Sequence, residues 1–320
     1  MKLPGRVAAQ ASQWLTLEDL RLYRVVVVIP AYNEDDHIGS VVLKLFHHPV
    51  KVIVVDDGSS DDTAWVAEAA GALVMRHCQN KGKGEALNTG FCEARRLQPD
   101  VIVVIDADGQ HLPEQLPLLV GPVLAGVADI VVGSRYLEKT SQVPPHRLLG
   151  HWFFNHLTRL TSGISVSDSQ SGYRAFSPRA YNSGWFHCSD FSVEAEMQFL
   201  AHEHGLRVME VPITIRYDEK PKRSVWQQGL NVLNGVLRLT GQYRPLLFFG
   251  LTGAVCMVTG LGWNLWVMDH SIFMYDLATI IREVLFITGL IMLSTGLTLH
   301  SVRSLLINLL RDQRQAKGGE

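Results

Sequence analysis

Short apolar runs alternate with helical patterns along residues 24–215, and this alternation constrains the fold more than any other feature. Strands are predicted at 24–30, 50–57, 72–77, 100–108, 129–136 and 207–216. Helical patterns lie between them, at 34–46, 61–70, 83–97 and 113–125. Runs such as VVVVI are apolar throughout, as a parallel sheet buried on both faces requires. The order predicts an open α/β sheet that binds ligands beyond the carboxyl ends of its strands.

Polar residues follow several of these strands directly. The segments are Pro30–Glu34, Asp56–Ser59, Asp106–Gln110 and Gly133–Tyr136. Carboxylates at neighbouring strand ends repel one another unless they bind something, and a divalent cation with phosphate ligands resolves that conflict. A D-x-D pair is a weak signal alone, but here it comes directly after the strand VIVVI. The chain has neither a G-x-G-x-x-G after its first strand nor a Walker loop, which argues against a dinucleotide site or a P-loop.

Charge and cysteine content exclude other classes. The net charge of −2 leaves no basic footprint for nucleic acid, so we expect no nucleic-acid partner. The four cysteines are widely separated and form no C-x-x-C, which argues against a disulfide framework and a structural zinc site. Residues 216–320 hold 11 Lys and Arg against 7 Asp and Glu, so the basic charge gathers at the back of the chain.

Two long uncharged runs predict a membrane anchor. They span 24 residues at 245–268 and 19 residues at 284–302, close to the about 20 residues that cross a bilayer. Basic residues flank the pair on both outer sides, whereas the loop 269–283 carries Asp269, Asp276 and Glu283 against a single Arg282. The positive-inside rule therefore predicts an integral membrane protein with its front domain on the cytoplasmic face. The competing interpretation is a pair of buried helices in a large soluble core.

A further helix is predicted between the domain and the first run. Trp226, Leu230, Leu233 and Leu237 share one helical face, and the basic cluster KPKR (220–223) precedes them. This pattern is typical of a helix in the membrane interface, where it would contact membrane lipids, but an amphipathic helix packed on the domain fits equally well. The predicted organisation is a segment 1–23, a domain 24–220, a juxtamembrane helix 221–243, a two-helix hairpin 245–310 and a tail 311–320.

The strand-end motifs, taken together, resemble a known family. VVVVIPAYNE, VVDDGSSDDT, NKGKGEALNTG, DADGQH, GSRY and SDSQSGYR are similar to the motifs of family 2 glycosyltransferases with the GT-A fold. Within that family the chain resembles the polyprenyl-phosphate sugar transferases, of the dolichyl-phosphate mannose synthase type. The resemblance covers about residues 24–225. It implies metal-dependent, inverting transfer of a hexose (glucose, mannose or N-acetylglucosamine) from a UDP- or GDP-sugar to a membrane polyprenyl or dolichyl phosphate.

The resemblance also implies residue roles. The nucleotide-sugar site would be formed by Pro30, Tyr32, Glu34, Asp57, Lys83, Asp106 and Ala107. Mg²⁺ or Mn²⁺ would be held by Asp106, Asp108 and Gln110. The catalytic set would be Asp106, Asp108, Arg135 and Asp168. The acceptor phosphate would meet Arg135, Gln170, Arg174, Arg216, Lys222 and Arg223.

Some alternatives remain open. Arg174 could instead be a structural partner of Asp168, and His111 could join the metal site or lie behind it or on the surface. Many relatives carry a Gly-x-Ser-Lys element where this chain reads KPKRSV, so the choice among Arg216, Lys222 and Arg223 stays open. The alternative function is a polymer-extending glycosyltransferase, although the Q-x-x-R-W element usual in such enzymes is missing. A homo-oligomer is a further possibility.

Overall fold

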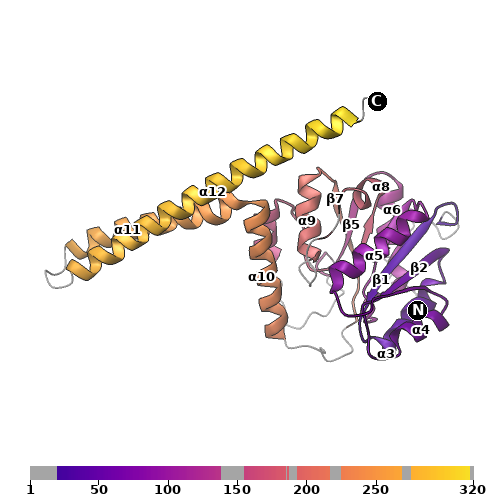
Figure 1. Ribbon diagram of the computed structural model, residues 1–320. Helices are drawn as coiled ribbons and strands as arrows, with labels where there is room; N and C mark the ends of the chain where they lie inside the picture. Colours follow the sequence, from indigo (N-terminus) through magenta and orange to yellow (C-terminus); the bar gives the residue numbers. More distant parts are fainter. Residues whose placement is uncertain are drawn as a thin grey trace. The chain divides into compact units, whose positions relative to one another are not determined.

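The computed structural model describes residues 20–137, 155–184, 186, 193–216, 225–268 and 275–317. These residues form two compact units, one up to Val236 and one from Leu237 onward (Figure 1). The predicted segment boundaries differ from this division and stay predictions. Lys222 and Arg223 lie outside the described residues, as does most of the segment 1–23, although Leu20 is buried in the core.

The first unit is built on a seven-stranded sheet of order β3-β2-β1-β4-β6-β5-β7. The strands are β1 (Val25–Ala31), β2 (Val50–Asp56), β3 (Leu73–Arg76), β4 (Val101–Val104), β5 (Ile130–Ser134), β6 (Arg174–Phe176) and β7 (Val208–Pro212). The helices are α3 (Asp35–Leu45), α4 (Thr63–Ala69), α5 (Lys83–Arg96), η1 (Pro113–Gln115), α6 (Leu116–Leu124), α8 (Pro178–Tyr181) and α9 (Val193–Glu203). The predicted open α/β sheet is therefore confirmed, and all six predicted strands are present.

The sheet is mixed because of β6. β1 pairs in parallel with β2 and β4, and β2 pairs in parallel with β3, so the carboxyl ends of these strands meet at one edge. β6 runs antiparallel between β4 and β5, with Val104 and Val132 both opposite Arg174. The sequence did not predict this three-residue strand. The fourth predicted strand extended to residue 108, but β4 ends at Val104, and this leaves Asp106 and Asp108 in a loop.

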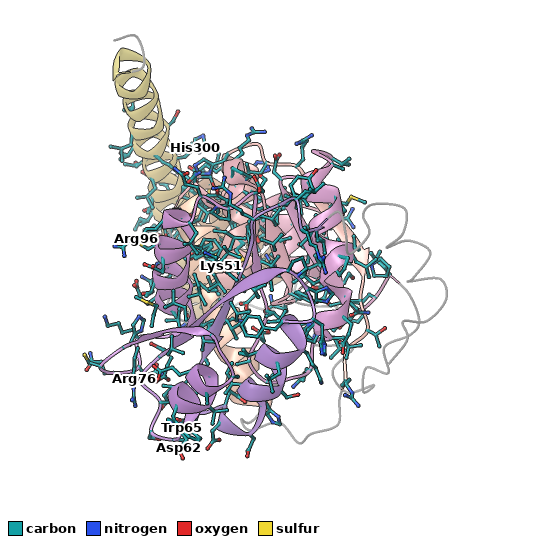
Figure 2. All side chains as sticks on the ribbon, turned by 90° about the vertical axis from the view of Figure 1, so that its right-hand side faces the viewer. Lys51, Asp62, Trp65, Arg76, Arg96 and His300 are labelled. Carbon is teal, nitrogen blue, oxygen red and sulfur yellow. The ribbon has the colours of Figure 1, made fainter. Side chains whose placement is uncertain are left out.

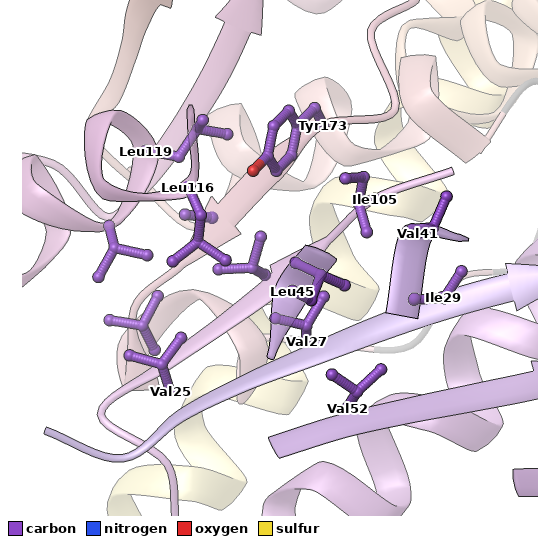
Figure 3. Packing of buried hydrophobic residues seen from close by; sticks show 14 of the residues in the cluster. Val25, Val27, Ile29, Val41, Leu45, Val52, Ile105, Leu116, Leu119 and Tyr173 are labelled. Atoms are coloured by element: carbon purple, nitrogen blue, oxygen red, sulfur yellow. The ribbon is translucent and has the colours of Figure 1, made fainter. Parts of the chain in front are cut away.

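Apolar side chains of β1 and α3 make up much of the core (Figure 3). Val25, Val27 and Ile29 alternate along β1 and point to the same face, as the two-residue period of a strand requires. Val41 and Leu45, one turn apart on α3, are buried in the same cluster. On the outside, charged side chains such as Lys51 and Arg96 face solvent (Figure 2). Trp65 of α4 is also 68% exposed.

α10 (Val225–Tyr243) continues from the first unit into the second, which also contains η2 (Leu246–Gly250), α11 (Leu251–Met268) and α12 (Tyr275–Lys317). Among the described residues one segment, Thr279–Leu306 of α12, is long and apolar enough to cross a membrane. The segments Leu233–Tyr243 and Leu246–Gly262 pass the same test only together, and they are bent by 103° at the break between them. The second transmembrane helix of the prediction is therefore not established by this criterion.

α11 packs side by side with the first part of α12, which extends beyond it (Figure 1). Glycines permit the close approach: an ideal Cβ on Gly253 would lie 2.6 Å from the carbonyl oxygen of Gly289, and the reverse distance is also 2.6 Å. Arg303 of α12 contacts the end of α10, where its Nη1 donates a hydrogen bond to the Gln242 carbonyl at 3.0 Å. Its guanidinium also lies 4.8 Å from the centre of the Tyr243 ring. Arg303 thus joins α12 to the last turn of α10.

Leu237 on the predicted apolar face of α10 is 39% exposed. The buried residues of this helix include Val236 and Leu239, which lie on other faces, and Thr240, which lies three residues after Leu237 on the side of the stripe. The side chains of Trp226 and Leu230 lie outside the described part of the chain. Of the two stripe residues whose side chains the structure describes, Leu237 is exposed and Leu233 is partly buried.

Candidate active site

Asp106 lies at the centre of a polar cluster beyond the end of β4. Its Oδ1 accepts a hydrogen bond from Lys83 Nζ at 2.6 Å, and its Oδ2 lies 3.6 Å from His111 Nε2. Asp108 follows two residues later, and its Oδ1 accepts a hydrogen bond from the Gln110 amide at 3.1 Å. Ala107 between them is buried. The structure therefore brings Asp106, Asp108 and Lys83 together, and their predicted roles toward nucleotide and cation stay predictions.

The two aspartates have opposite pKa shifts. Burial would raise the pKa of Asp106, but the charge of Lys83 and the neighbouring His111 outweigh it and hold this pKa well below its usual value. For Asp108, burial and the nearby charge of Asp106 raise the pKa. Carboxylates with strongly shifted pKa values in one cluster are common at functional sites.

Lys83 is the first residue of α5 and is held by two carboxylates. Besides Asp106 it donates to Glu194 Oε1 of α9, at 2.5 Å. Burial would lower the pKa of Lys83, but the charges of Asp106 and Glu194 outweigh it and raise the pKa, so the ammonium stays protonated. Glu194 was not predicted from the sequence. It lies 111 residues from Lys83 along the chain, and no local pattern marks it.

The backbone at Gly172 lies in close contact with the Asp106 carboxylate, which is possible because glycine has no side chain. An ideal Cβ at this glycine would lie 2.3 Å from Asp106 Oδ2, so no larger residue fits without movement. Tyr173 beside it is fully buried, and its ring lies 5.3 Å from that of His111. His111 is itself buried, so of the alternatives for this residue the surface position is wrong, and its ring lies behind Asp106.

Asp57 at the end of β2 holds the loop that leads to Lys83. Its Oδ1 accepts from His77 Nδ1 at 2.7 Å and from the Lys81 amide at 2.9 Å. Its Oδ2 accepts from the Gly82 amide at 2.7 Å. Both carboxylate oxygens are therefore engaged within the protein. The predicted contact of Asp57 with a nucleotide base stays a prediction.

The turn that follows β1 lies beside the turn that follows β2. Tyr32 is 38% exposed, Pro30 lies opposite Val55 in the sheet, and the Glu34 amide donates to Thr63 Oγ1 at 2.8 Å. Between them Asn33 adopts a left-handed φ of 54°, a conformation that asparagine tolerates better than most residues. Its side-chain oxygen accepts from the Ser60 amide at 2.9 Å, which ties this turn to the one after β2.

Arg135 and Asp168 form a bidentate ion pair at the end of β5. Arg135 Nε lies 2.6 Å from Asp168 Oδ2, and Nη2 lies 2.6 Å from Oδ1. Glu210 of β7, also missed by the sequence analysis, accepts hydrogen bonds from the amides of Ser167, at 2.8 Å, and Asp168, at 3.2 Å. Glu210 thereby fixes the turn that presents Asp168 to Arg135.

Arg174 is buried and does not pair with Asp168. Its guanidinium donates to the carbonyls of Ser171 at 2.8 Å, Ser169 at 2.8 Å and Glu194 at 3.0 Å. In this position Arg174 joins the 169–171 turn to the first turn of α9. The neighbouring Gln170 donates to Ser169 Oγ at 3.2 Å. Contact of either residue with an acceptor phosphate stays a prediction.

Arg216 lies beside the Asp106–Gln110 loop. Its amide donates to the Gln110 carbonyl at 3.0 Å, and the preceding residue, Ile215, forms a β-bridge with His111. Arg216 is exposed at this point. Arg216 is therefore next to the aspartate cluster, and Lys222 and Arg223 follow it in the sequence.

The cluster suits a cation that keeps substrate phosphates among its ligands. No group of three His, Cys, Asp or Glu side chains that could hold a metal occurs among the residues the structure describes. Asp106 and Asp108 do supply carboxylate oxygens, and Mg²⁺ is usually bound by one or two carboxylates together with substrate phosphates. Oxygen donors suit Mn²⁺ equally well. The residues present therefore fit such a cation.

Comparisons with known proteins agree with this geometry. Residues 26–185 match the family described as "Glycosyl transferase family 2". The chain is 32% identical over 233 residues to the UDP-N-acetylglucosamine–dolichyl-phosphate N-acetylglucosaminyltransferase of Methanococcus voltae, covering 66% of this chain and 91% of that one. It is 33% identical to the polyprenol monophosphomannose synthase of Mycolicibacterium smegmatis, covering 60% of this chain and 77% of that one.

A solved structure gives the same assignment. The glucosyl-3-phosphoglycerate synthase of Mycobacterium tuberculosis, in complex with Mn²⁺, UDP and glucosyl-3-phosphoglycerate, superposes with a TM-score of 0.57. The two are 27% identical, and the match covers 75% of this chain and 86% of that one. The open mixed sheet is thus GT-A-like. The family match over the sheet and its strand-end motifs shows that this chain is a glycosyltransferase and belongs to family 2.

Proposed function

We propose that the protein transfers a hexose (glucose, mannose or N-acetylglucosamine) from a UDP- or GDP-sugar to a membrane polyprenyl or dolichyl phosphate. The observation that carries this proposal is the Asp106–Asp108–Lys83 cluster beside an arginine-containing segment that leads to an apolar C-terminal unit. Relatives named for transfer to dolichyl phosphate and for polyprenol monophosphomannose synthesis support it. The transfer is metal-dependent and proceeds with inversion.

The donor site lies at the ends of β1, β2 and β4. Pro30, Tyr32, Glu34 and Asp57 line the nucleotide, and Asp57 also keeps the Lys81–Gly82 backbone in place. Asp106, Asp108 and Gln110 would hold Mg²⁺ or Mn²⁺, and the cation would supply positive charge near the diphosphate leaving group. Lys83 adds a fixed ammonium to the same region, and a preorganised charge of this kind stabilises charge that develops during reaction.

The acceptor site lies around Arg135. An acceptor phosphate monoester is largely ionised at neutral pH, with a second pKa near ~6, so a strong general base is unnecessary. Asp168, bidentate to Arg135, orients the guanidinium toward the acceptor rather than removing a proton. Arg174, with its donors on backbone carbonyls, acts as a positioning residue for the turn that carries Gln170.

The basic segment after the domain guides the lipid phosphate. Arg216 lies at the edge of the aspartate loop, and Lys222 and Arg223 follow it in the chain. An exposed Leu237 on α10 agrees with a helix in the membrane interface. The apolar α11 and α12 form the anchor, and the catalytic domain lies on the cytoplasmic face.

Radiolabelled sugar transfer tests the proposal. Membranes containing the protein are incubated with a short polyprenyl phosphate and a panel of UDP- and GDP-sugars, and label is measured in the lipid extract. One donor is expected to give labelled lipid, and Asp108→Asn is expected to remove it while the variant stays folded and membrane-bound. EDTA is expected to abolish transfer and added Mn²⁺ or Mg²⁺ to restore it. Label in a growing glycan, with none in lipid phosphate, would reject the proposal.

A further inference from the structure

Glu194 is a buried carboxylate with no assigned role in the transfer. It lies in the first turn of α9 and is 4% exposed. Its Oε1 accepts from Lys83 Nζ at 2.5 Å, and its buried Oε2 accepts no hydrogen bond from the residues that the structure describes. A buried charge that is only half satisfied is costly, so its presence at this position needs a physical explanation.

The neighbour of Glu194 is Lys83, whose ammonium also donates a hydrogen bond to Asp106. Lys83 Nζ lies 2.6 Å from the Oδ1 of Asp106, so it covers an oxygen that a cation would need. A divalent cation on Asp106 repels an ammonium at that distance, and Lys83 is too buried to leave for solvent, with 14% of its side chain exposed. The ammonium therefore needs a second carboxylate close by when a cation enters.

The charges of the cluster support this assignment. The carboxylates of Asp106, Asp108 and Glu194 outnumber the two buried cations beside them, Lys83 and Arg174. Loss of Glu194 removes one of the negative charges that favour a divalent cation in this cluster. The backbone of Glu194 is held in place, because its carbonyl accepts a hydrogen bond from Arg174 Nη1 at 3.0 Å. The carboxylate is thus presented to Lys83 from a fixed point on α9.

We infer that Glu194 is a positioning residue that takes over Lys83 when a divalent cation displaces it from Asp106, and so sets the cation affinity without binding the cation. The inference deepens the proposed function, since it rests on the cation in that proposal. It requires neither the polyprenyl acceptor nor a particular sugar.

Mn²⁺ binding to the full-length protein in detergent tests the inference, measured from the electron paramagnetic resonance signal of free Mn²⁺ without nucleotide or acceptor. Glu194→Gln keeps the shape but removes the charge, and it is expected to raise the Kd for Mn²⁺ about tenfold. Lys83→Met is expected to lower the Kd. The double variant is expected to return to within about threefold of the wild-type Kd, since the two lost charges cancel.

Glu203→Gln is the matched control, because it removes the same charge from the exposed end of the same helix and is expected to leave the Kd unchanged. Thermal unfolding of each variant verifies that it is folded. A double variant as weak as Glu194→Gln alone would overturn the inference and make Glu194 a direct ligand or a purely structural group. An unchanged Kd in Glu194→Gln would also overturn it. Absence of sugar transfer to polyprenyl phosphate, with the expected Mn²⁺ pattern intact, would reject the proposed function and leave this inference standing.

Discussion

Gly172 shows how a single hydrogen in place of a methyl group determines the shape of the site. Its backbone lies so close to Asp106 that an added Cβ would fall 2.3 Å from Oδ2, well inside van der Waals contact. Asp106 is already fixed on its other oxygen by Lys83. The carboxylate can therefore accommodate a larger residue 172 only by leaving its present position.

Gly172→Ala is accordingly expected to lower the rate of sugar transfer about 100-fold, the loss that a misplacement of about 1 Å can produce at a reacting centre. The rate is measured with saturating donor and metal, and Mn²⁺ affinity is measured in parallel. Gly184→Ala serves as the control, because its added Cβ would meet nothing closer than Leu200 at 3.9 Å. Equal activities of the two variants would show that Asp106 need not occupy its observed position.

The residues that sequence analysis predicted and those that it missed differ in a physical way. Asp106, Asp108 and Lys83 stand in local motifs at a strand end or a helix start, so their proximity follows from the topology of a parallel sheet. Glu194 and Glu210 reach the site from α9 and β7, across sequence separations of 111 and 42 residues to Lys83 and Asp168. Contacts of that range depend on tertiary packing, which no local pattern encodes.

At the scale of elements, the same distinction holds for the strands. The long apolar runs predicted the bounds of β1 and β2 to within one residue at each end. A parallel strand that is buried on both faces must be apolar along its whole length. β6 has only the three residues Arg174–Phe176 and begins with a buried arginine, so its own sequence carries no strand signal. Its place between β4 and β5 is determined by its partners.

Asp129, just before β5, ties the start of β5 to that of β7. Its Oδ2 accepts from the Arg207 amide at 2.9 Å and from Arg207 Nε at 3.0 Å. The hydrogen bond from the Arg207 side chain, against the opposing effect of burial, lowers the pKa of Asp129. A carboxylate whose pKa is lower in the folded state stabilises the fold above its unfolded pKa of about 3.9, and this contribution is lost as the pH falls through the folded pKa.

Asp129→Asn is therefore expected to lower the Tm by a few degrees at pH 7, in line with a destabilisation of about 1 kcal/mol. The difference from wild type is expected to shrink below about pH 4, where the unfolded wild-type chain takes up the proton. Thermal unfolding followed by circular dichroism between pH 3 and pH 7 measures both curves. A Tm difference independent of pH would contradict the electrostatic account.

The α11–α12 pair provides a second test at this scale. Gly253 and Gly289 face each other so closely that a side chain on either would meet the other's carbonyl oxygen at 2.6 Å. Small residues at such crossings let membrane helices pack without a hydrophobic driving force. Gly289→Leu is expected to separate the helices and make the protein sensitive to protease in detergent. Gly262→Leu, where an added Cβ meets nothing within 4 Å, is expected to match the wild type. Equal sensitivity of both variants would mean that the crossing does not depend on glycine.

At the scale of the whole molecule, the length of α12 restricts how the chain can lie in a membrane. The helix has 43 residues, and at about 1.5 Å per residue it is roughly twice as long as the ~30 Å hydrocarbon core. It must therefore extend beyond the bilayer. Its apolar part, Thr279–Leu306, is followed by Arg311, Arg314 and Lys317, whereas the loop before it is acidic. By the positive-inside rule we expect the end of α12 in the cytoplasm, on the side where the proposed function puts the catalytic domain.

Cysteine labelling of intact cells tests this orientation. In a background with Cys78, Cys92, Cys188 and Cys256 replaced by serine, Ser271→Cys is expected to react with an impermeant thiol reagent, because the expected orientation puts the 269–283 loop outside. Gly318→Cys is expected to react only after the cells are permeabilised. A reversed pattern would place the catalytic domain on the outer face, away from the cytoplasmic pool of nucleotide sugars. Labelling of both positions from outside would place both ends of α12 on one side of the membrane, and this outcome would reject α12 as a membrane span.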